Sequence, residues 1–301
     1  MNTRDIYQQV TDQIIACIES GAGNCEMPWH RSGVAQTRPT NVLTGNAYRG
    51  VNVIGLWAAA EVRGFSTGTW GTYRQWKEKG AQVRKGEKSS LVVFYKQFDV
   101  ESTGEESGDT ATDTRRMMAR ASWVFNADQV DGWTPPSAEV AANPVETLAQ
   151  AEQFISATGA NIRHAGQNAY YHRGNDYIQM PDKTAFTGTE TMSATEGYYA
   201  VLLHELTHWS GAQKRLDRTF GKRFGDDAYA MEELVAELGA AFLCADLGIT
   251  AQARPDHAAY IDHWMRVMKA DKKAIFTAAS KASQAADYLV GCKSKVTEAA
   301  A

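Results

Sequence analysis

The chain has 301 residues, of which 44% are hydrophobic and 22% charged, and its net charge at pH 7 is −4. This composition is that of an ordinary globular protein, long enough for two domains. No apolar run approaches the about 20 residues of a membrane-spanning helix, so we expect no membrane contact.

The first segment, residues 1–21, alternates apolar and acidic positions at helical spacing, which predicts an amphipathic helix rather than a signal peptide. The cysteines are scattered and form no C-x-x-C pair, so we expect reduced thiols in a cytoplasmic protein, none of them a metal ligand. They are Cys17, Cys25, Cys244 and Cys292.

The N-terminal half is basic: residues 29–98 hold eleven Lys and Arg against three acids. Cations interleaved with aromatic rings are typical of single-stranded DNA binding, because cations contact phosphates and rings stack on bases. The competing interpretation is that the rings are core and the lysines a solvated face. The candidate DNA-contacting residues are Tyr48, Arg49, Trp76, Lys77, Arg84, Lys85 and Lys88.

Within this half, residues 69–80 predict a helix and residues 91–95 a strand. The acidic stretch 99–113, with six acids and no base, should be a loop that joins this strand to a hairpin partner at 122–125. Residues 136–143, which lie between Pro135-Pro136 and Pro144, predict a linker between a domain at 1–135 and another at 144–301.

The C-terminal half opens with a predicted helix at 145–158. Short strands are expected at 162–164, 169–171 and 176–181, and the chain should end in helices at 260–270 and 275–289.

The motif His204-Glu205-Leu206-Thr207-His208 places two imidazoles about 40° apart around a helix and roughly 6 Å apart along it. Both can hold one zinc ion, while Glu205 takes a proton from the zinc-bound water. The uncharged residues 198–203 predict that the helix is buried, where a metal would satisfy its polar side chains. Gly211 is expected to end it in a left-handed conformation.

A second apolar helix is predicted at 229–243 and carries three acids. Glu233 and Glu237 share a face, whereas Glu232 is rotated by about 100°. We assign Glu233 as the third metal ligand and Glu237 as the acceptor of a hydrogen bond from a ligating histidine. The spacing resembles the E-x-x-A-D pattern of gluzincin metallopeptidases, with Glu in place of Asp at 237, which leaves open which acid takes the metal.

Several separate motifs together resemble the ArdC-type antirestriction proteins of conjugative plasmids, which are related to the N-terminal part of plasmid-encoded primases. The motifs cover residues 38–41, 44–45, 48–52, 82–87, 125–129, 204–211, 215–218 and 232–237. The resemblance implies a single-stranded-DNA-binding domain joined to a zincin-like metallopeptidase domain, and a role in protecting incoming plasmid DNA from restriction.

We therefore expect an α+β protein of two domains, a small α+β DNA-binding domain and a gluzincin-like metallopeptidase domain. The expected cofactor is Zn²⁺, with Mn²⁺ as the alternative, and the expected partners are single-stranded DNA and a DNA-bound protein substrate. In zincin folds, a strand such as 176–181 pairs with an extended substrate. The candidates for stabilising the oxyanion are His164, Tyr170, Tyr171 and His172. The competing class is a DNA-coating protein with a non-catalytic metal site.

Overall fold

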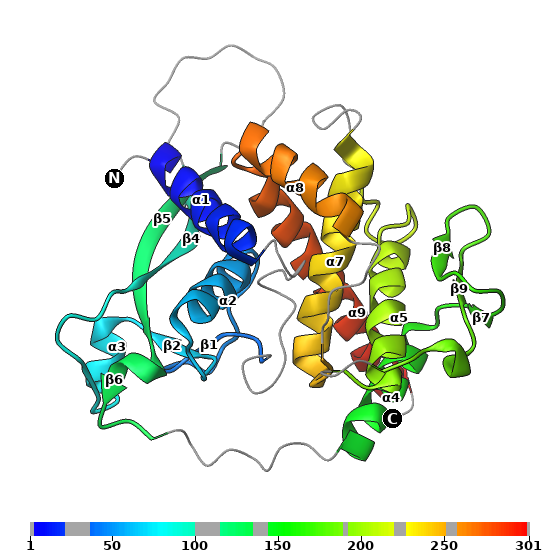
Figure 1. Ribbon diagram of the computed structural model, residues 1–301, viewed down its shortest axis with the longest axis horizontal. Helices are drawn as coiled ribbons and strands as arrows, with labels where there is room; N and C mark the ends of the chain where they lie inside the picture. Colours follow the sequence, from blue (N-terminus) through cyan, green and yellow to red (C-terminus); the bar gives the residue numbers. More distant parts are fainter. Residues whose placement is uncertain are drawn as a thin grey trace.

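The computed structural model describes residues 3–21, 37–99, 115–134, 144–188, 192–219, 227–250 and 258–299. Strands dominate one side of the molecule and helices the centre, with a second, smaller sheet at the opposite edge (Figure 1). The expected two-domain α+β class is confirmed. The predicted linker at 136–143 lies outside the described residues.

The N-terminal half is a four-stranded sheet with two helices packed beside it. The strand order is β1-β2-β5-β4, and the long antiparallel hairpin of β4 and β5 confirms the predicted pairing, with Leu91 opposite Trp123. Its elements are α1 (Thr3–Gly21), β1 (Thr40–Asn41), α2 (Val51–Arg63), β2 (Thr69–Gly71), β4 (Ser90–Asp99) and β5 (Arg115–Asn126).

The helix predicted at 69–80 is shorter than expected. Residues Thr69–Gly71 form β2, and α3 covers only Tyr73–Glu78. The reason is Thr72, whose side chain accepts from the backbone of Gln75 in a capping box and so fixes the helix start. Beyond α3, β3 (Gln82–Val83) pairs with β6 (Val130–Asp131) around a small separate core.

The C-terminal half has a helical body and a three-stranded sheet. Its elements are α4 (Pro144–Thr158), β7 (Ile162–His164), β8 (Tyr170–His172), β9 (Tyr177–Met180), α5 (Ala194–Ser210), α7 (Ala228–Leu247), α8 (Ala258–Ala270) and α9 (Ala274–Ala299). These bounds match the predicted helices and strands to within four residues at each end, except that α9 extends ten residues beyond the predicted end at 289. Within the described part of the chain, no helix combines the length and apolar character needed to cross a membrane.

The strand expected to pair with a substrate is in the middle of its sheet. The order is β7-β9-β8, so β9 is hydrogen-bonded on both sides and has no edge to offer. The expectation for 176–181 is therefore wrong. Alternation of apolar residues predicts a strand but does not tell an edge from a centre, and the edge strands of this sheet are β7 and β8.

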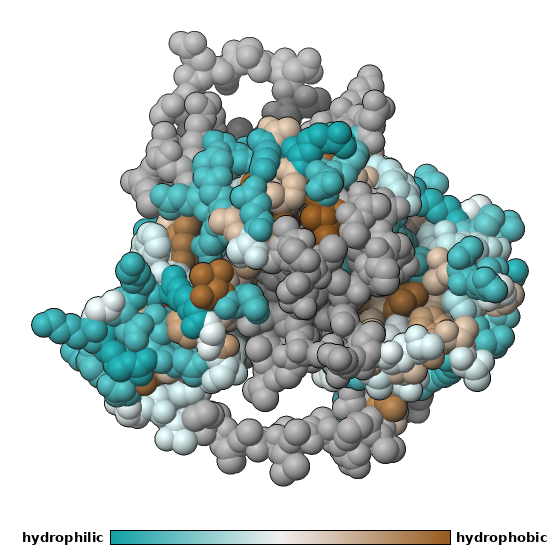
Figure 2. Space-filling view, viewed as in Figure 1, coloured by the Kyte–Doolittle hydropathy of each residue, from teal (hydrophilic) through white to brown (hydrophobic). Residues whose placement is uncertain are grey.

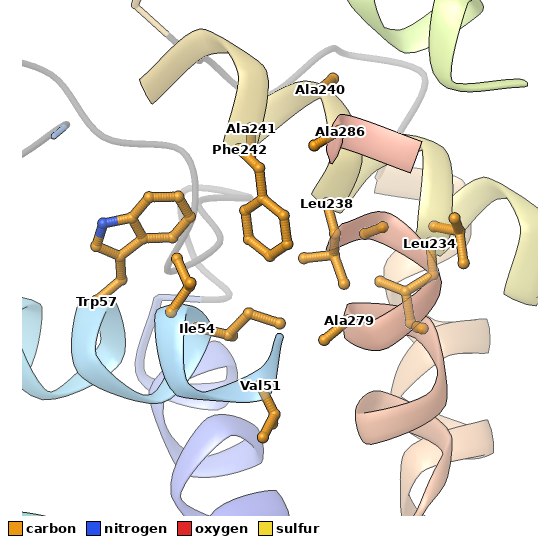
Figure 3. Close-up of a cluster of buried hydrophobic side chains, with 14 of the residues drawn as sticks. Val51, Ile54, Trp57, Leu234, Leu238, Ala240, Ala241, Phe242, Ala279 and Ala286 are labelled. Carbon is orange, nitrogen blue, oxygen red and sulfur yellow. The ribbon is translucent and has the colours of Figure 1, made fainter. Parts of the chain in front are cut away.

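The two halves share one hydrophobic core. Figure 3 shows apolar side chains of α2 facing those of α7 and α9, and the rings of Trp57 and Phe242 lie 5.9 Å apart. The side chains at this junction include Val51, Ile54, Trp57, Leu234, Leu238, Phe242, Ala279 and Ala286. Most of them are fully buried, so burial at the junction stabilises both halves together.

Candidate metal centre

Helix α5 holds the two histidines in a rigid, buried position. Ser193 caps its start in a reciprocal capping box with Glu196, and its last two turns are buried almost completely. His204 and His208 project from the same face, and their Nε2 atoms lie 3.1 Å apart. Thr207 donates to the carbonyl of Leu203 at 2.9 Å, so its hydroxyl is satisfied within the helix.

Helix α7 brings a carboxylate to the same point. Oxygens of Glu233 lie 3.4 Å from Nε2 of His204 and 3.6 Å from Nε2 of His208. The helices come this close because residue 239 is glycine: a Cβ there would lie 2.5 Å from the Cγ2 of Thr207. Any larger residue would push α7, and Glu233 with it, away from the histidines.

These three side chains fit a metal ion by their donor set and spacing. Their potential ligand atoms all lie within 4.8 Å of one another. Two nitrogens bound to one tetrahedral zinc at about 2.05 Å would be about 3.3 Å apart. The histidine nitrogens and the Glu233 oxygens already stand within a few tenths of an ångström of that separation.

Each histidine has a second carboxylate on its outer nitrogen. Glu237 Oε2 lies 3.5 Å from Nδ1 of His204, the place assigned to it from the sequence. Glu232 Oε1 lies 3.1 Å from Nδ1 of His208, a contact that sequence reasoning missed. The 100° rotation of Glu232 from Glu233 removes it from the metal-facing side of α7 but carries it to the far side of His208. Such carboxylates fix the orientation of ligating imidazoles.

Glu232 is itself held by a buried arginine. The guanidinium of Arg218, 1% exposed, donates to its two oxygens at 2.6 and 2.8 Å and to the carbonyl of Thr207 at 2.7 Å. Gly211 makes room for it, because a Cβ there would lie 2.7 Å from an Arg218 nitrogen. Gly211 ends α5 as predicted, but with φ −79° rather than in the left-handed region. It is needed for space, not for backbone conformation.

The carboxylates set the charge of the site. Burial favours neutral imidazole, but Glu232 and Glu233 outweigh it and raise the pKa of His208 to about 10. Burial also opposes ionisation of Glu232, yet hydrogen bonds from Arg218 and His208 lower its pKa to about 2. Glu205, 4% exposed, contributes to the raised pKa of both histidines. The site therefore concentrates negative charge around the two imidazoles, which suits a divalent cation.

The small sheet approaches this centre at the end of β8. Arg173, which follows β8 and is 68% exposed, lies 4.0 Å from Glu232.

The four candidates for oxyanion stabilisation are each hydrogen-bonded to another group. His164 contacts the Tyr198 hydroxyl, Tyr170 donates to Gln179, Tyr171 donates to Asp176, and His172 accepts from the backbone of Asn175.

Two of the predicted DNA-contacting residues are buried. Trp76 is 0% exposed, donates from Nε1 to the carbonyl of Phe125 and packs on Trp133 in the small core. Tyr48 is 6% exposed, and its hydroxyl accepts a hydrogen bond from Asn41. Neither can offer a ring face to a base, so a stacking role for them is wrong; interleaving with cations does not distinguish core rings from surface rings.

The predicted cations are exposed, on the hydrophilic corner around α3 in Figure 2 and beside the junction of the halves. Lys77, Lys85 and Lys88 belong to the corner. Arg84 lies there too but is paired with Glu87 and Asp131. Arg49, 61% exposed, instead forms an ion pair with Asp287 of α9.

Two family models match consecutive parts of the chain. Residues 4–125 match the N-terminal domain of the anti-restriction factor ArdC, and residues 149–281 match a zincin-like metallopeptidase. The metallopeptidase match contains both helices of the histidine centre.

The chain is also similar to solved and curated proteins along nearly its whole length. Two crystal structures of the antirestriction protein ArdC from plasmid R388 are 41% identical to it. The metal-free one covers 97% of this chain and 98% of that protein with a TM-score of 0.76; the Mn(II)-bound one covers 95% and 97% with a TM-score of 0.72.

Protein y4eC of Sinorhizobium fredii (strain NBRC 101917 / NGR234) is 50% identical over 95% of this chain and 91% of its own length. A DNA primase TraC of Escherichia coli is 33% identical over 97% of this chain, which spans only 28% of that primase.

Proposed function

This chain belongs to the ArdC family of antirestriction proteins, and from that premise we propose that it binds single-stranded DNA, cleaves protein at a zinc site and protects incoming plasmid DNA during conjugation. The observation that carries the enzymatic part is the convergence of His204, His208 and Glu233 beside Glu205. The basic N-terminal half supports the DNA-binding part.

The metal would be held by the two imidazoles and the Glu233 carboxylate, a set that suits zinc; the Mn(II)-bound relative supports a divalent ion in general. When bound, such an ion polarises a carbonyl and lowers the pKa of water towards 7. Glu232 and Glu237 would keep both imidazoles oriented with Nε2 towards the centre.

The chain's own catalytic group would be Glu205. Its carboxylate accepts the proton of the attacking water and passes it to the nitrogen of the leaving amine. The free edge of β8 could pair with an extended substrate, because β8 pairs only with β9 among the described strands. This edge is close to the metal centre, since Arg173, directly after β8, lies near Glu232. The substrate strand of the proposal is thus β8 rather than β9.

Two alternative functions differ in whether the metal site is catalytic. One is a metalloprotease that needs DNA and cleaves a DNA-bound protein; the other is a DNA-coating protein whose metal only stabilises the fold. Among the described residues three side chains converge on the centre, and we assign the neighbouring Glu205 as the base. Structural zinc sites are normally closed by four protein ligands, so this arrangement favours catalysis.

The test is cleavage of a protein bound to single-stranded DNA by the full chain loaded with Zn²⁺. Fragments should appear with wild type and disappear with Glu205→Gln, whose metal content is measured in parallel. Equal cleavage by a metal-loaded Glu205→Gln protein would overturn the assigned base. Absence of any cleavage by metal-loaded wild type, with DNA still bound, would favour the coating protein.

A further inference from the structure

A cleft of about 880 Å³ lies between the two halves of the molecule. One wall is formed by the start of α1, residues 41–52, Gln75 of α3 and the middle of β4. The other is formed by Lys273 and the first half of α9. The walls are tied together at one end, where the backbone N–H of Gly50 donates to the Ser283 hydroxyl at 2.9 Å. The cleft therefore exists only when both halves are present.

The wall formed by α9 is a polar stripe on an otherwise apolar helix. The polar side chains that line it without being buried are Lys273, which directly precedes α9, and Thr277, Ser280, Lys281 and Gln284; Phe276 and the buried Ser283 line it as well. These positions recur at three- and four-residue spacing and so share one helix face, whereas the alanines between them are buried against the core. A polar face is usual on a surface helix, but this one lines the cleft, so its side chains can contact a ligand there.

The charge of the cleft is positive. Arg49, Lys273 and Lys281 line it, and among the described residues none of those lining it carries a carboxylate. Asp287, which pairs with Arg49, is not part of this lining. The basic corner around Arg84 has a smaller hollow of its own, of about 530 Å³, and its lining includes the acids Glu87 and Asp131. Of the two, the cleft is the better environment for a polyanion.

Aromatic rings stand next to these cations. Phe94 and Tyr95 in the middle of β4 are 49% and 44% exposed and line the cleft. Tyr7 and Phe276 pack edge to face at 4.6 Å, with the Lys273 ammonium 5.2 Å from the Tyr7 ring. Exposed rings on a strand beside cations are what unpaired bases and their phosphates need. A duplex keeps its bases stacked inside, so its bases cannot reach these rings.

We propose that this cleft binds a short stretch of single-stranded DNA, with bases on Phe94 and Tyr95 and phosphates on Lys273 and Lys281. The inference rests on the proposed DNA-binding function and adds that the metallopeptidase half supplies part of the DNA site. Helix α9 continues from the cleft to α5, where Tyr288 packs near Trp209 with ring centres 6.3 Å apart (Figure 1). Helix α9 therefore connects the proposed DNA site to α5, the helix that carries His204 and His208.

The first test compares three charge-matched variants of the full chain by fluorescence anisotropy with labelled oligo-dT. Lys273→Gln/Lys281→Gln should weaken binding about tenfold and lower the slope of log affinity against log salt by about 1.4. Lys85→Gln/Lys88→Gln, on the basic corner, should weaken it less. Lys183→Gln/Lys214→Gln, away from both, controls for net charge and should bind as wild type.

The second test separates stacking from charge. Tyr95→Ala should lose affinity on the order of tenfold, Tyr95→Phe should retain it, and Tyr73→Ala, an equally exposed ring at the corner, should be near wild type. If wild type binds oligo-dT but the cleft variants bind equally well, the cleft assignment alone is overturned. If wild type itself does not bind, the proposed function fails. Binding of dTMP as tight as that of the oligomer would show a mononucleotide pocket and also overturn the inference.

Discussion

The histidine centre and the cleft are two opposite kinds of site. In the centre, side chains from two helices meet within 3.1–3.6 Å and are 5–14% exposed. In the cleft, residues from five separate segments line about 880 Å³, and several of these residues are half exposed. A site built from few close contacts fails when one is removed, whereas a site built from many weak contacts loses affinity by degrees.

The largest effect is expected at the metal ligands. Purified wild type should carry about one divalent ion per chain. His204→Ala, His208→Ala and Glu233→Ala should each empty the site and abolish metal-dependent cleavage, because three ligands are the minimum set for a catalytic zinc. Elemental analysis of the purified variants after dialysis measures this directly.

Glu205→Gln is the matched control for these variants, since Glu205 is buried next to the ligand His204 in the sequence but is not assigned as a ligand. It should keep the ion and the fold while losing cleavage. Retention of the ion by Glu233→Ala together with its loss in Glu237→Ala would reverse the assignment of the two acids.

The second prediction tests whether the halves are separable. Phe242→Ala removes a fully buried ring that packs on Trp57 across the junction and should cost about 3–5 kcal/mol of unfolding free energy. Because the core is shared, tryptophan fluorescence and circular dichroism should report one transition for both halves. Val62→Ala on α2, 69% exposed, is the control and should change stability by less than about 0.5 kcal/mol. Two separate transitions would show independent domains.

The sequence predicts the histidine centre better than it predicts the DNA-binding surface, and the reason is physical. His204 and His208 lie on one helix, so the helical period alone places both. Glu233 needs only the further assumption that two apolar helices pack together. Glu232 was missed because its contact depends on the angle at which α7 crosses α5 and on Arg218 behind it, which local periodicity does not contain.

For the fold, long periodic helices such as α5 and α7 were predictable, and so was the β4–β5 hairpin. Which rings are buried was not, because Tyr73 and Trp76 lie on the same short helix, each followed by a cation, and have opposite exposure in the structure. The role of the polar stripe on α9 could not be predicted from the sequence either, because the stripe forms a cleft only with residues 41–52, which are far away in the sequence.

The third prediction concerns the carboxylates behind the histidines. Glu237→Gln should weaken metal affinity about 10- to 100-fold through looser orientation of His204, with little change in stability. Glu232→Gln should weaken the metal similarly and also lower the unfolding free energy of the metal-free protein by about 3–5 kcal/mol, because it leaves the buried Arg218 without its counter-charge. Competition titration with a zinc indicator and denaturant unfolding give the two numbers. Equal stability of both variants would argue against a structural role for the Arg218–Glu232 pair.

The smallest effect is expected where the two sites are brought into one assay, protection of incoming DNA from restriction. Protection by coating requires that DNA be occupied, and the cleft that we assign to DNA contains none of His204, Glu205, His208 or Glu233. Glu205→Gln keeps the assigned ligands and the cleft, so it should protect transferred plasmid DNA as well as wild type does. The Lys273→Gln/Lys281→Gln variant should protect less, in proportion to its lost DNA affinity. Conjugation frequency into restricting and non-restricting recipients, with each variant at matched expression, measures both. Loss of protection in a folded, metal-loaded, DNA-binding Glu205→Gln protein would show that protection proceeds through proteolysis, and would place the substrate among the proteins that meet the entering strand.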